Sequence, residues 1–282
     1  MTLDRLPSLL MGAVAYDPKV VTIWDGFRGW FRGQGLDFDY VLYSNYERQV
    51  DELVSGRIDA AWNSPLAWAR TARLAPAARA VCMRDTDQDL TSVVVVRDGS
   101  GIESVADLAG RIVGTGAVDS PQATLIPVAH LRDSGATGFG TRAFDVGVGL
   151  HGDHIGGERD AARALMSGEV DAACMIDASH LLFVKEGTLP PGSTRVLAQT
   201  GPYDHCNMTV LADGSDPTVE LFGRLLLAMS YADPTVRPLL DLEGLTEWKP
   251  GRTSGYAALE KAVDATGFYD AEGNVTASGY HP

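Results

Sequence analysis

Residues 56–68 of the chain read Gly-Arg-Ile-Asp-Ala-Ala-Trp-Asn-Ser-Pro-Leu-Ala-Trp, and this stretch says the most about the architecture. The residues before it, Glu47–Ser55, have helical spacing, and Gly56 suits the left-handed position that follows a helix. A short apolar strand, Ala60–Trp62, then leads into a second helical stretch, Pro65–Ala72. Helix, strand and helix in such quick succession are typical of an α/β fold.

The same arrangement recurs once later in the chain. Residues 50–61 read Val-Asp-Glu-Leu-Val-Ser-Gly-Arg-Ile-Asp-Ala-Ala, and residues 162–173 read Ala-Arg-Ala-Leu-Met-Ser-Gly-Glu-Val-Asp-Ala-Ala. In both copies a helix ends at Ser-Gly, and a strand with Ala-Ala follows directly. Two copies are too few for a solenoid, so the repeat predicts two similar α/β lobes.

Short apolar runs alternate with helical stretches along the rest of the chain, which predicts mainly parallel sheets flanked by helices. Further strands are expected at Leu9–Val14, Phe38–Leu42, Ser92–Val96, Ile112–Gly114, Arg142–Val146, Ala172–Ile176 and Met208–Leu211. Further helices are expected at Thr22–Arg32, Val105–Leu108, Thr124–Asp133, Arg159–Ser167, Ala178–Lys185, Thr218–Ala232 and Tyr256–Ala265.

The 282 residues include 23 Lys and Arg against 37 Asp and Glu, which gives a formal net charge of −14. Because no basic run interrupts this acidic balance, nucleic acid and anionic membrane surfaces are excluded as partners. The longest apolar runs, such as Leu225–Met229, fall far short of the ~20 residues that span a bilayer, so no membrane insertion is expected.

The sequence also bears on the cellular compartment. Three cysteines, Cys82, Cys174 and Cys206, have no paired spacing and predict free thiols in a reducing compartment. The first residues, Met1–Pro7, lack the basic start and apolar core of a secretory signal. As written, the sequence therefore predicts a cytoplasmic protein, or a periplasmic or extracellular one if a leader was removed.

Beyond these patterns, the chain resembles the phosphonate/phosphate-type substrate-binding proteins of ABC transporters. The resemblance rests on residues 53–68, Leu90–Ile102, Val105–Arg111, the echo at residues 168–173 and Thr200–Tyr203, within a span from Leu9 to about Leu240. It implies a type II periplasmic-binding-protein fold, in which two α/β lobes are joined by two crossing strands and hold the ligand between them. Residues 1–90 with 207–282 would form the first lobe, and residues 91–206 the second.

In open α/β sheets, ligands bind beyond the carboxyl ends of the strands, where helix N-termini favour anions. By the resemblance, the first lobe would contact the ligand through Tyr16, Asn45, Tyr46, Asn63 and Ser64, and the second through Ser120, Gln122 and Ala123. Loops that follow strands add His151, His154, Asp177, His180, Tyr203 and His205. The chain departs from the family at Asp119 and Pro121, because Pro121 lacks an amide donor and Asp119 adds negative charge. This departure disfavours a doubly charged phosphonate.

Four of the six histidines, His151, His154, His180 and His205, fall in the predicted cleft loops. Such side chains can hydrogen-bond a ligand, act as acid/base groups, bind a metal or serve structural roles. We expect no cofactor and no bound metal.

Two functions remain open at this point. One is a binding protein that closes on a small anionic or zwitterionic ligand and serves an ABC permease if it is exported. The alternative is a cytoplasmic enzyme on the same fold, similar to the menaquinone-pathway chorismate dehydratase. In that case His151, His154 or His205 would perform acid/base chemistry of the lyase or hydrolase type, or metal-assisted chemistry, on a small carboxylated substrate. Fold alone does not separate the two, so whether the chain is an enzyme stays open.

Overall fold

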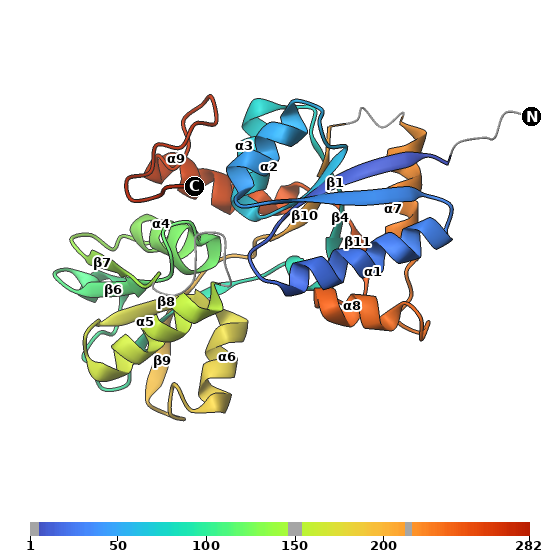
Figure 1. Cartoon of the computed structure of the whole chain (residues 1–282). Helices are drawn as coiled ribbons and strands as arrows, with labels where there is room; N and C mark the ends of the chain where they lie inside the picture. The colour runs from blue at the N-terminus through green and yellow to red at the C-terminus, as the bar shows by residue number, and fades with distance from the viewer. Residues whose placement is uncertain (1–5, 146–153, 212–215) are drawn as a thin grey trace, which may run out of the picture.

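The computed structural model describes residues 6–145, 154–211 and 216–282, and Figure 1 shows them arranged as two lobes. Each lobe contains one β-sheet flanked by helices. The strand order is β11-β4-β10-β3-β1-β2 in the sheet of the first lobe and β7-β6-β8-β5-β9 in the sheet of the second. The predicted two-lobed α/β architecture is confirmed.

The first sheet contains β1 (Ser8–Val14), β2 (Asp37–Tyr43), β3 (Ala60–Asn63), β4 (Arg79–Arg84), β10 (Asn207–Val210) and β11 (Trp248–Pro250). β1 runs parallel to β2 and β3, whereas β10 and β11 pair antiparallel with their neighbours. Because β1 lies inside the sheet and helices cover both faces, its residues from Met11 to Val14 are all buried.

The second sheet contains β5 (Ser92–Arg97), β6 (Ile112–Thr115), β7 (Gly140–Ala143), β8 (Ala172–Ile176) and β9 (Thr194–Gln199). β6 runs parallel to β7 and β8, while β5 pairs antiparallel with β8 and β9. Successive side chains of a strand point to opposite faces. Val93 and Val95 accordingly belong to one apolar cluster, and Val94 and Val96 belong to another.

Each sheet is mixed rather than mainly parallel, and both follow one layout. Three parallel strands, β2-β1-β3 or β7-β6-β8, are followed by one antiparallel strand, β10 or β5. This strand is antiparallel because the chain enters the sheet from the other lobe. The two Ala-Ala pairs of the sequence repeat, in β3 and in β8, occupy the same position of this layout.

In the described part of the chain, five helices cover the sheet of the first lobe. α1 (Lys19–Gly33), α7 (Pro217–Ala228) and α8 (Arg237–Glu243) pack on one face, and α2 (Tyr46–Val54) and α3 (Pro65–Leu74) lie on the other. α1 buries Val20, Ile23, Trp24, Phe27 and Phe31, which have the spacing of one helix face. The Phe31 ring lies 4.7 Å from that of Phe38 and so contributes to an aromatic core.

In the second lobe, the π-helical turn η3 (Pro121–Leu125) continues directly into α4 (Ile126–Asp133). α4 packs on one face of the sheet, and α5 (Ile155–Ser167) and α6 (Asp177–Glu186) pack on the other. The two connections between the lobes run side by side, because Leu90 and Tyr203 exchange backbone hydrogen bonds of 2.8 and 2.9 Å.

The helix α9 (Ala257–Thr266) joins the lobes at a third place (Figure 1). Its apolar residues form one cluster with Leu66 of α3 and Ile126 of α4. Ion pairs of 2.6 Å tie Asp264 of α9 to Arg73 of α3, and Lys261 of α9 to Asp133 of α4. α9 therefore contacts both lobes.

Some elements differ from the expectation. The strands β4, β9 and β11 and the helix α8 were not predicted. The helix expected at Thr218–Ala232 ends at Ala228, because Met229 takes an extended conformation and buries its side chain. The strand expected at Arg142–Val146 corresponds to β7, and Val146 lies outside the described residues.

The three cysteines are buried and free of disulfides, as predicted. Among the described residues, no helix combines the length and the apolar character needed to cross a bilayer.

Candidate ligand-binding site

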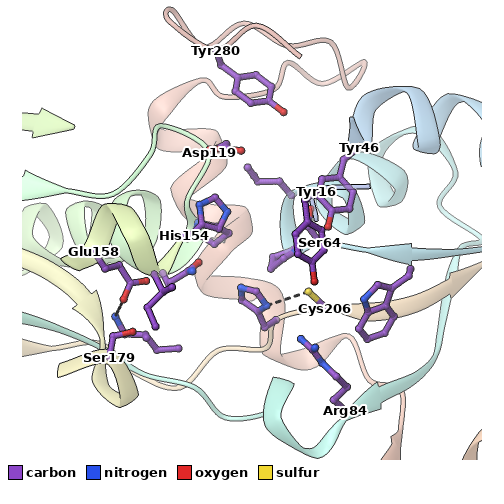
Figure 2. A pocket seen from close by; sticks show the side chains of 18 of the residues that line it. Tyr16, Tyr46, Ser64, Arg84, Asp119, His154, Glu158, Ser179, Cys206 and Tyr280 are labelled. Atoms are coloured by element: carbon purple, nitrogen blue, oxygen red, sulfur yellow. Dashed lines mark hydrogen bonds between the residues drawn. The ribbon is translucent and has the colours of Figure 1, made fainter. Parts of the chain in front are cut away.

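A cavity of about 320 Å³ is lined by residues of both lobes (Figure 2). Six helical elements of the described chain begin at its wall: α1, α2, α3, η3, α5 and α6. The first-turn amides of a helix lack intrahelical partners and carry the positive end of the helix dipole. The wall is therefore suited to an anionic group.

Two of these helical elements begin with the same pattern, Ser-Pro-Leu-Ala at residues 64–67 and Ser-Pro-Gln-Ala at residues 120–123. Each serine hydroxyl accepts the amide of the alanine three residues later, at 3.2 Å for Ser64 and 3.1 Å for Ser120. Ser64 lines the cavity, whereas Ser120 is fully buried. The Ser64 hydroxyl can thus donate to a ligand while it accepts from Ala67.

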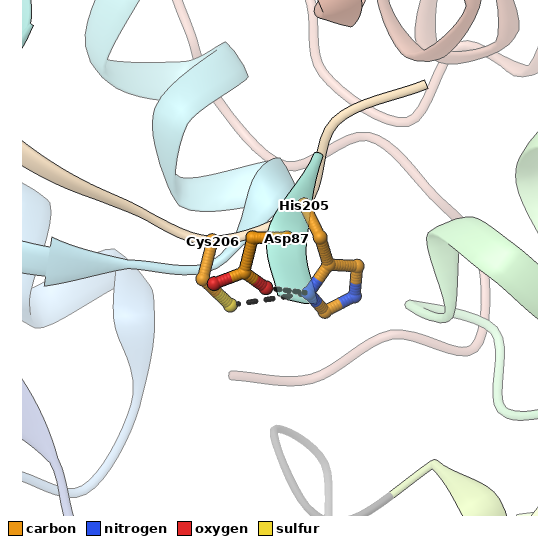
Figure 3. A group of neighbouring side chains, drawn as sticks. All are labelled: Asp87, His205 and Cys206. Carbon is orange, nitrogen blue, oxygen red and sulfur yellow. Dashed lines mark hydrogen bonds and ion pairs between the residues drawn. The ribbon is translucent and has the colours of Figure 1, made fainter. Parts of the chain in front are cut away.

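One end of the cavity is formed by a polar cluster of Arg84, Asp87, His205 and Cys206. Nε of Arg84 lies 2.6 Å from Oδ2 of Asp87, and Nη2 lies 3.0 Å from Oδ1. Nδ1 of His205 lies 3.2 Å from Sγ of Cys206 and 3.5 Å from Oδ1 of Asp87 (Figure 3). Arg84, His205 and Cys206 line the cavity, while Asp87 lies behind them.

The side chains of this cluster shift each other's pKa values and thereby determine which of them are charged at neutral pH. Burial lowers the pKa of His205, but Cys206 and Asp87 outweigh it and raise that pKa to about 10. Burial raises the pKa of Asp87, but Arg84 and His205 outweigh it and lower that pKa to about 2. Beside Arg84, burial raises the pKa of Glu243 to about 7. At neutral pH, Arg84 and His205 are therefore cations that can face an anionic group of a ligand.

Asp87, His205 and Cys206 also form the one group of metal-ligating side chains found in the described part of the chain, with ligand atoms within 4.8 Å of one another. Both oxygens of Asp87 already accept from Arg84, however, and the guanidinium charge opposes a metal cation at this distance. The geometry fits a network of charges and hydrogen bonds better than a metal centre.

Buried carboxylates and tyrosines line the opposite end of the cavity (Figure 2). Glu47 lies in the first turn of α2, and Asp119 precedes η3. The hydroxyls of Tyr269 and Tyr280 donate to Oε1 of Glu47 at 3.0 and 2.8 Å. Because Glu47 and Asp119 are only 8% and 4% exposed, this end is suited to a cationic group.

Glu158 of α5 adds a third carboxyl group to the wall, in the second lobe. Its Oε2 accepts the amide of Ile176 at 3.2 Å. Burial raises the pKa of Glu158 to about 7, against the hydrogen bonds from Ser179, Ile176 and Gln122. This side chain therefore changes its protonation near neutral pH.

Aromatic rings form the wall of the first lobe. The Arg84 guanidinium lies 5.3 Å from the ring centre of Trp62, a cation–π arrangement. Burial raises the pKa of Tyr16 to about 12, so its hydroxyl remains a donor at neutral pH. Tyr16, Tyr46 and Trp62 together leave room for a small ligand between rings and helix starts.

Residues 15–256 match the family model described as the ABC transporter, phosphonate, periplasmic substrate-binding protein. The chain belongs to this family. It is a small-molecule binding protein of the phosphonate type, so the binding function anticipated from the sequence is supported and the enzyme alternative is not. The family is periplasmic, which leaves the cytoplasmic expectation without support.

Solved structures of low sequence identity share the fold of this phosphonate-type binding protein. PhnD1 from Prochlorococcus marinus in complex with methylphosphonate is 15% identical with a TM-score of 0.66, over 93% of this chain and 98% of that one. A Xanthomonas citri protein bound to chloride is 20% identical with a TM-score of 0.68, over 92% and 98%. The periplasmic aliphatic sulphonate binding protein SsuA from Escherichia coli is 16% identical with a TM-score of 0.52, over 90% and 89%. These likenesses confirm the predicted periplasmic-binding-protein fold. No curated protein matches the chain.

The cavity of this phosphonate-type protein brings together part of the site predicted from the sequence. The predicted residues on its wall are Tyr16, Tyr46, Ser64, Gln122, His154 and His205. His154 begins α5 in the second lobe, whereas His205 lies on the connection that returns to the first. The third catalytic candidate of the enzyme alternative, His151, lies outside the described residues.

Other predicted residues are near the cavity but do not line it: Asn45, Asn63, Ser120, Ala123, Asp177, His180 and Tyr203. Asn45 and Ser120 cap α2 and η3, and Ala123 is the fully buried residue that donates to Ser120. Asp177 accepts the hydroxyl of Thr91 at 2.8 Å. These residues form hydrogen bonds with other groups of the protein.

Asn63 and Tyr203 are buried in polar networks behind the wall. Nδ2 of Asn63 donates to Oγ1 of Thr209 at 2.9 Å, and its Oδ1 accepts from Gln49 at 2.8 Å. The hydroxyl of Tyr203 lies 2.6 Å from that of Ser92. His180, also away from the wall, lies on α6 one turn past its start.

Several residues of the wall were not predicted from the sequence, among them Glu47, Arg84, Tyr269 and Tyr280. Arg84 ends β4, a strand that was not predicted, so its position at a strand end had no signal. Glu47 is adjacent to the predicted Tyr46 in the same first turn of a helix, which could have identified it. The two tyrosines follow the last helix in a stretch without hydrophobic periodicity.

Proposed function

We propose that the chain captures a small zwitterion, with an anionic head and an amine at opposite ends, and delivers it to the permease of an ABC transporter. The proposal extends family membership, which supports a binding protein for small ligands and a permease partner. The proposal assigns the protein to the periplasm, the compartment named in the family description.

The observation that carries this proposal is the separation of charges along one cavity. Figure 2 shows Arg84 and Cys206 at one end and Asp119 and Tyr280 at the other. His205 lies 3.2 Å from Cys206, and Glu47 accepts a hydrogen bond from Tyr280, which places these two lining residues at the same respective ends. The two carboxylates would attract an ammonium group of the ligand, and this attraction is stronger in a buried site than in water. A ligand without a cationic group would not gain it.

The charge of the anionic head follows from the helix starts. Pro65 removes one amide donor from the start of α3, beside Ser64 on the cavity wall. Fewer donors favour a singly charged head, such as a carboxylate, a sulfonate or a phosphonate monoanion, over a dianion.

Ligand capture by lobe closure supports the transport role. We infer that two units move relative to each other: residues 1–90 with 207–282, and residues 91–206. The connections near Leu90 and Tyr203 lie between the sheets and would bend, and the contacts of α9 with α4 would shift in the same motion. A ligand that touches both units binds the closed state more tightly than the open state, so ligand binding shifts the protein toward the closed state.

A set of matched probes tests the proposal. The protein is unfolded and refolded to remove bound ligand, and its melting temperature is measured with ethylphosphonate, ethanesulfonate and propionate and with their amino counterparts, 2-aminoethylphosphonate, taurine and β-alanine. The proposal predicts that an amine-bearing probe raises the melting temperature clearly more than its partner. Equal stabilisation within all three pairs would contradict it.

A further inference from the structure

The segment after α9, residues 267–282, contributes to the ligand cavity although it lies beyond the residues 15–256 that match the family. Tyr269 and Tyr280 of this segment line the cavity and are each 4% exposed. In Figure 2, Tyr280 reaches into the cavity from a loop above both lobes. The family match therefore does not account for this part of the wall.

Local contacts hold the segment in place. Gly267 ends α9 in a left-handed conformation with φ +61°, which glycine adopts without strain. Tyr269 forms a bridge with Val275, and the Thr276 amide donates to the Phe268 carbonyl at 3.0 Å. A tight loop thus returns the chain toward the cavity.

The segment is also fastened to its surroundings by side chains. The Arg70 guanidinium of α3 donates to the Gly273 carbonyl at 2.8 Å. The rings of Tyr269 and Tyr280 each lie 4.9 Å from the ring of Phe268. This packing leaves the two hydroxyls as the polar ends that face Glu47.

Both hydroxyls donate to the same atom, Oε1 of Glu47, at 3.0 and 2.8 Å. Burial and the Glu47 carboxylate raise the pKa of both phenols, so they stay protonated and act as donors. Two donors on one oxygen hold the carboxylate in a single orientation before a ligand binds, which lowers the entropy cost of binding.

We propose that Tyr269 and Tyr280 determine ligand specificity by orienting Glu47 toward the cationic group of the ligand; the proposal rests on the zwitterion function above. The hydroxyls are positioning groups that act through Glu47. Their removal would let the carboxylate turn away from the cavity while the anion-binding end stays intact.

The test compares wild type, Y269F/Y280F and Y231F by titration calorimetry with 2-aminoethylphosphonate and ethylphosphonate. Tyr231 is the matched control because its hydroxyl donates to Asp241 at 2.6 Å on the exposed surface, away from the cavity. We expect wild type and Y231F to prefer the amino compound. The double variant should lose this preference by about tenfold, with its affinity for ethylphosphonate changed less than threefold.

The remaining outcomes contradict the proposal in distinguishable ways. If Y269F/Y280F keeps the wild-type preference, or loses affinity for both probes equally, the tyrosines do not determine specificity, and the zwitterion function stands. If wild type shows no preference, the zwitterion function and this inference fail together. Should the double variant not fold, the single variant Y280F is measured against the same criteria.

Discussion

Arg84 and Asp87 form a bidentate ion pair at one end of the cavity, with contacts of 2.6 and 3.0 Å between guanidinium and carboxylate. The carboxylate of Asp87 is almost fully buried, and Nη1 of Arg84 also donates to the Glu243 carbonyl at 2.9 Å. The pair therefore joins the first connection between the lobes to α8, and it holds the guanidinium at the ligand cavity.

Replacement of Arg84 should destabilise the protein strongly. R84M leaves Asp87 buried without its main partner, and loss of one member of a buried pair costs about 3–5 kcal/mol. The matched control is R79M, because Arg79 and Glu220 form a half-exposed pair at 3.4 Å whose loss costs about 1 kcal/mol or less. Urea denaturation measures both. A loss for R84M no larger than that for R79M would contradict this account of the pair.

Glu158 should make the stability of the unliganded protein depend on pH. Its pKa of about 7 in the folded state lies above the ordinary value of 4.5, so the unfolded chain releases this proton first as the pH rises. The contribution of Glu158 is therefore fully present below pH 4.5 and is lost as the pH passes through about 7.

E158Q keeps the side chain neutral at every pH and should remove this loss. We expect the variant to exceed wild type in unfolding free energy by up to about 3 kcal/mol at pH 8 and by no more than about 1 kcal/mol at pH 5. Urea denaturation at the two pH values checks this, with the exposed Glu260 as the control in E260Q. An E158Q effect of equal size at both pH values would rule out the assigned protonation change.

Cys206 should be the cysteine that reacts first with iodoacetamide in the folded protein. It lines the cavity, whereas Cys82 and Cys174 are 0% exposed and burial raises the pKa of both their thiols. Peptide mass spectrometry after brief alkylation measures the fraction of each cysteine that is modified. A bound ligand should slow the modification of Cys206. Modification of all three cysteines at similar rates would contradict the position of Cys206 on the cavity wall.

The sequence predicted the lobes better than the site, for physical reasons. The Ser-Gly helix ends and Ala-Ala strands of the repeat mark local structure directly, and β3 and β8 indeed occupy the same place in the two sheets. β4 and β9 have polar or half-buried positions at both ends, so their pattern resembled that of loops.

The site depended on contacts that are distant in sequence. The rule that ligands bind at strand ends led to loops that line the cavity. It did not separate the polar side chains on the cavity wall from those that hydrogen-bond other groups of the protein. Asn63 turned inward to Thr209, and Ser120 turned to its own helix start. Glu47 is joined to Tyr280 across 233 positions of the chain, a relationship that no local pattern carries.

The central claim, a cavity that recognises both ends of a zwitterion, is tested most directly by E47Q. This substitution keeps the size of the side chain and removes the charge that would face the amine. Titration calorimetry should show the affinity for 2-aminoethylphosphonate reduced about tenfold or more, because a hydrogen-bonded charge in a buried site contributes about 1.5–3 kcal/mol. The affinity for ethylphosphonate should be unchanged or higher. An equal loss for both compounds, or no loss for either, would contradict the claim.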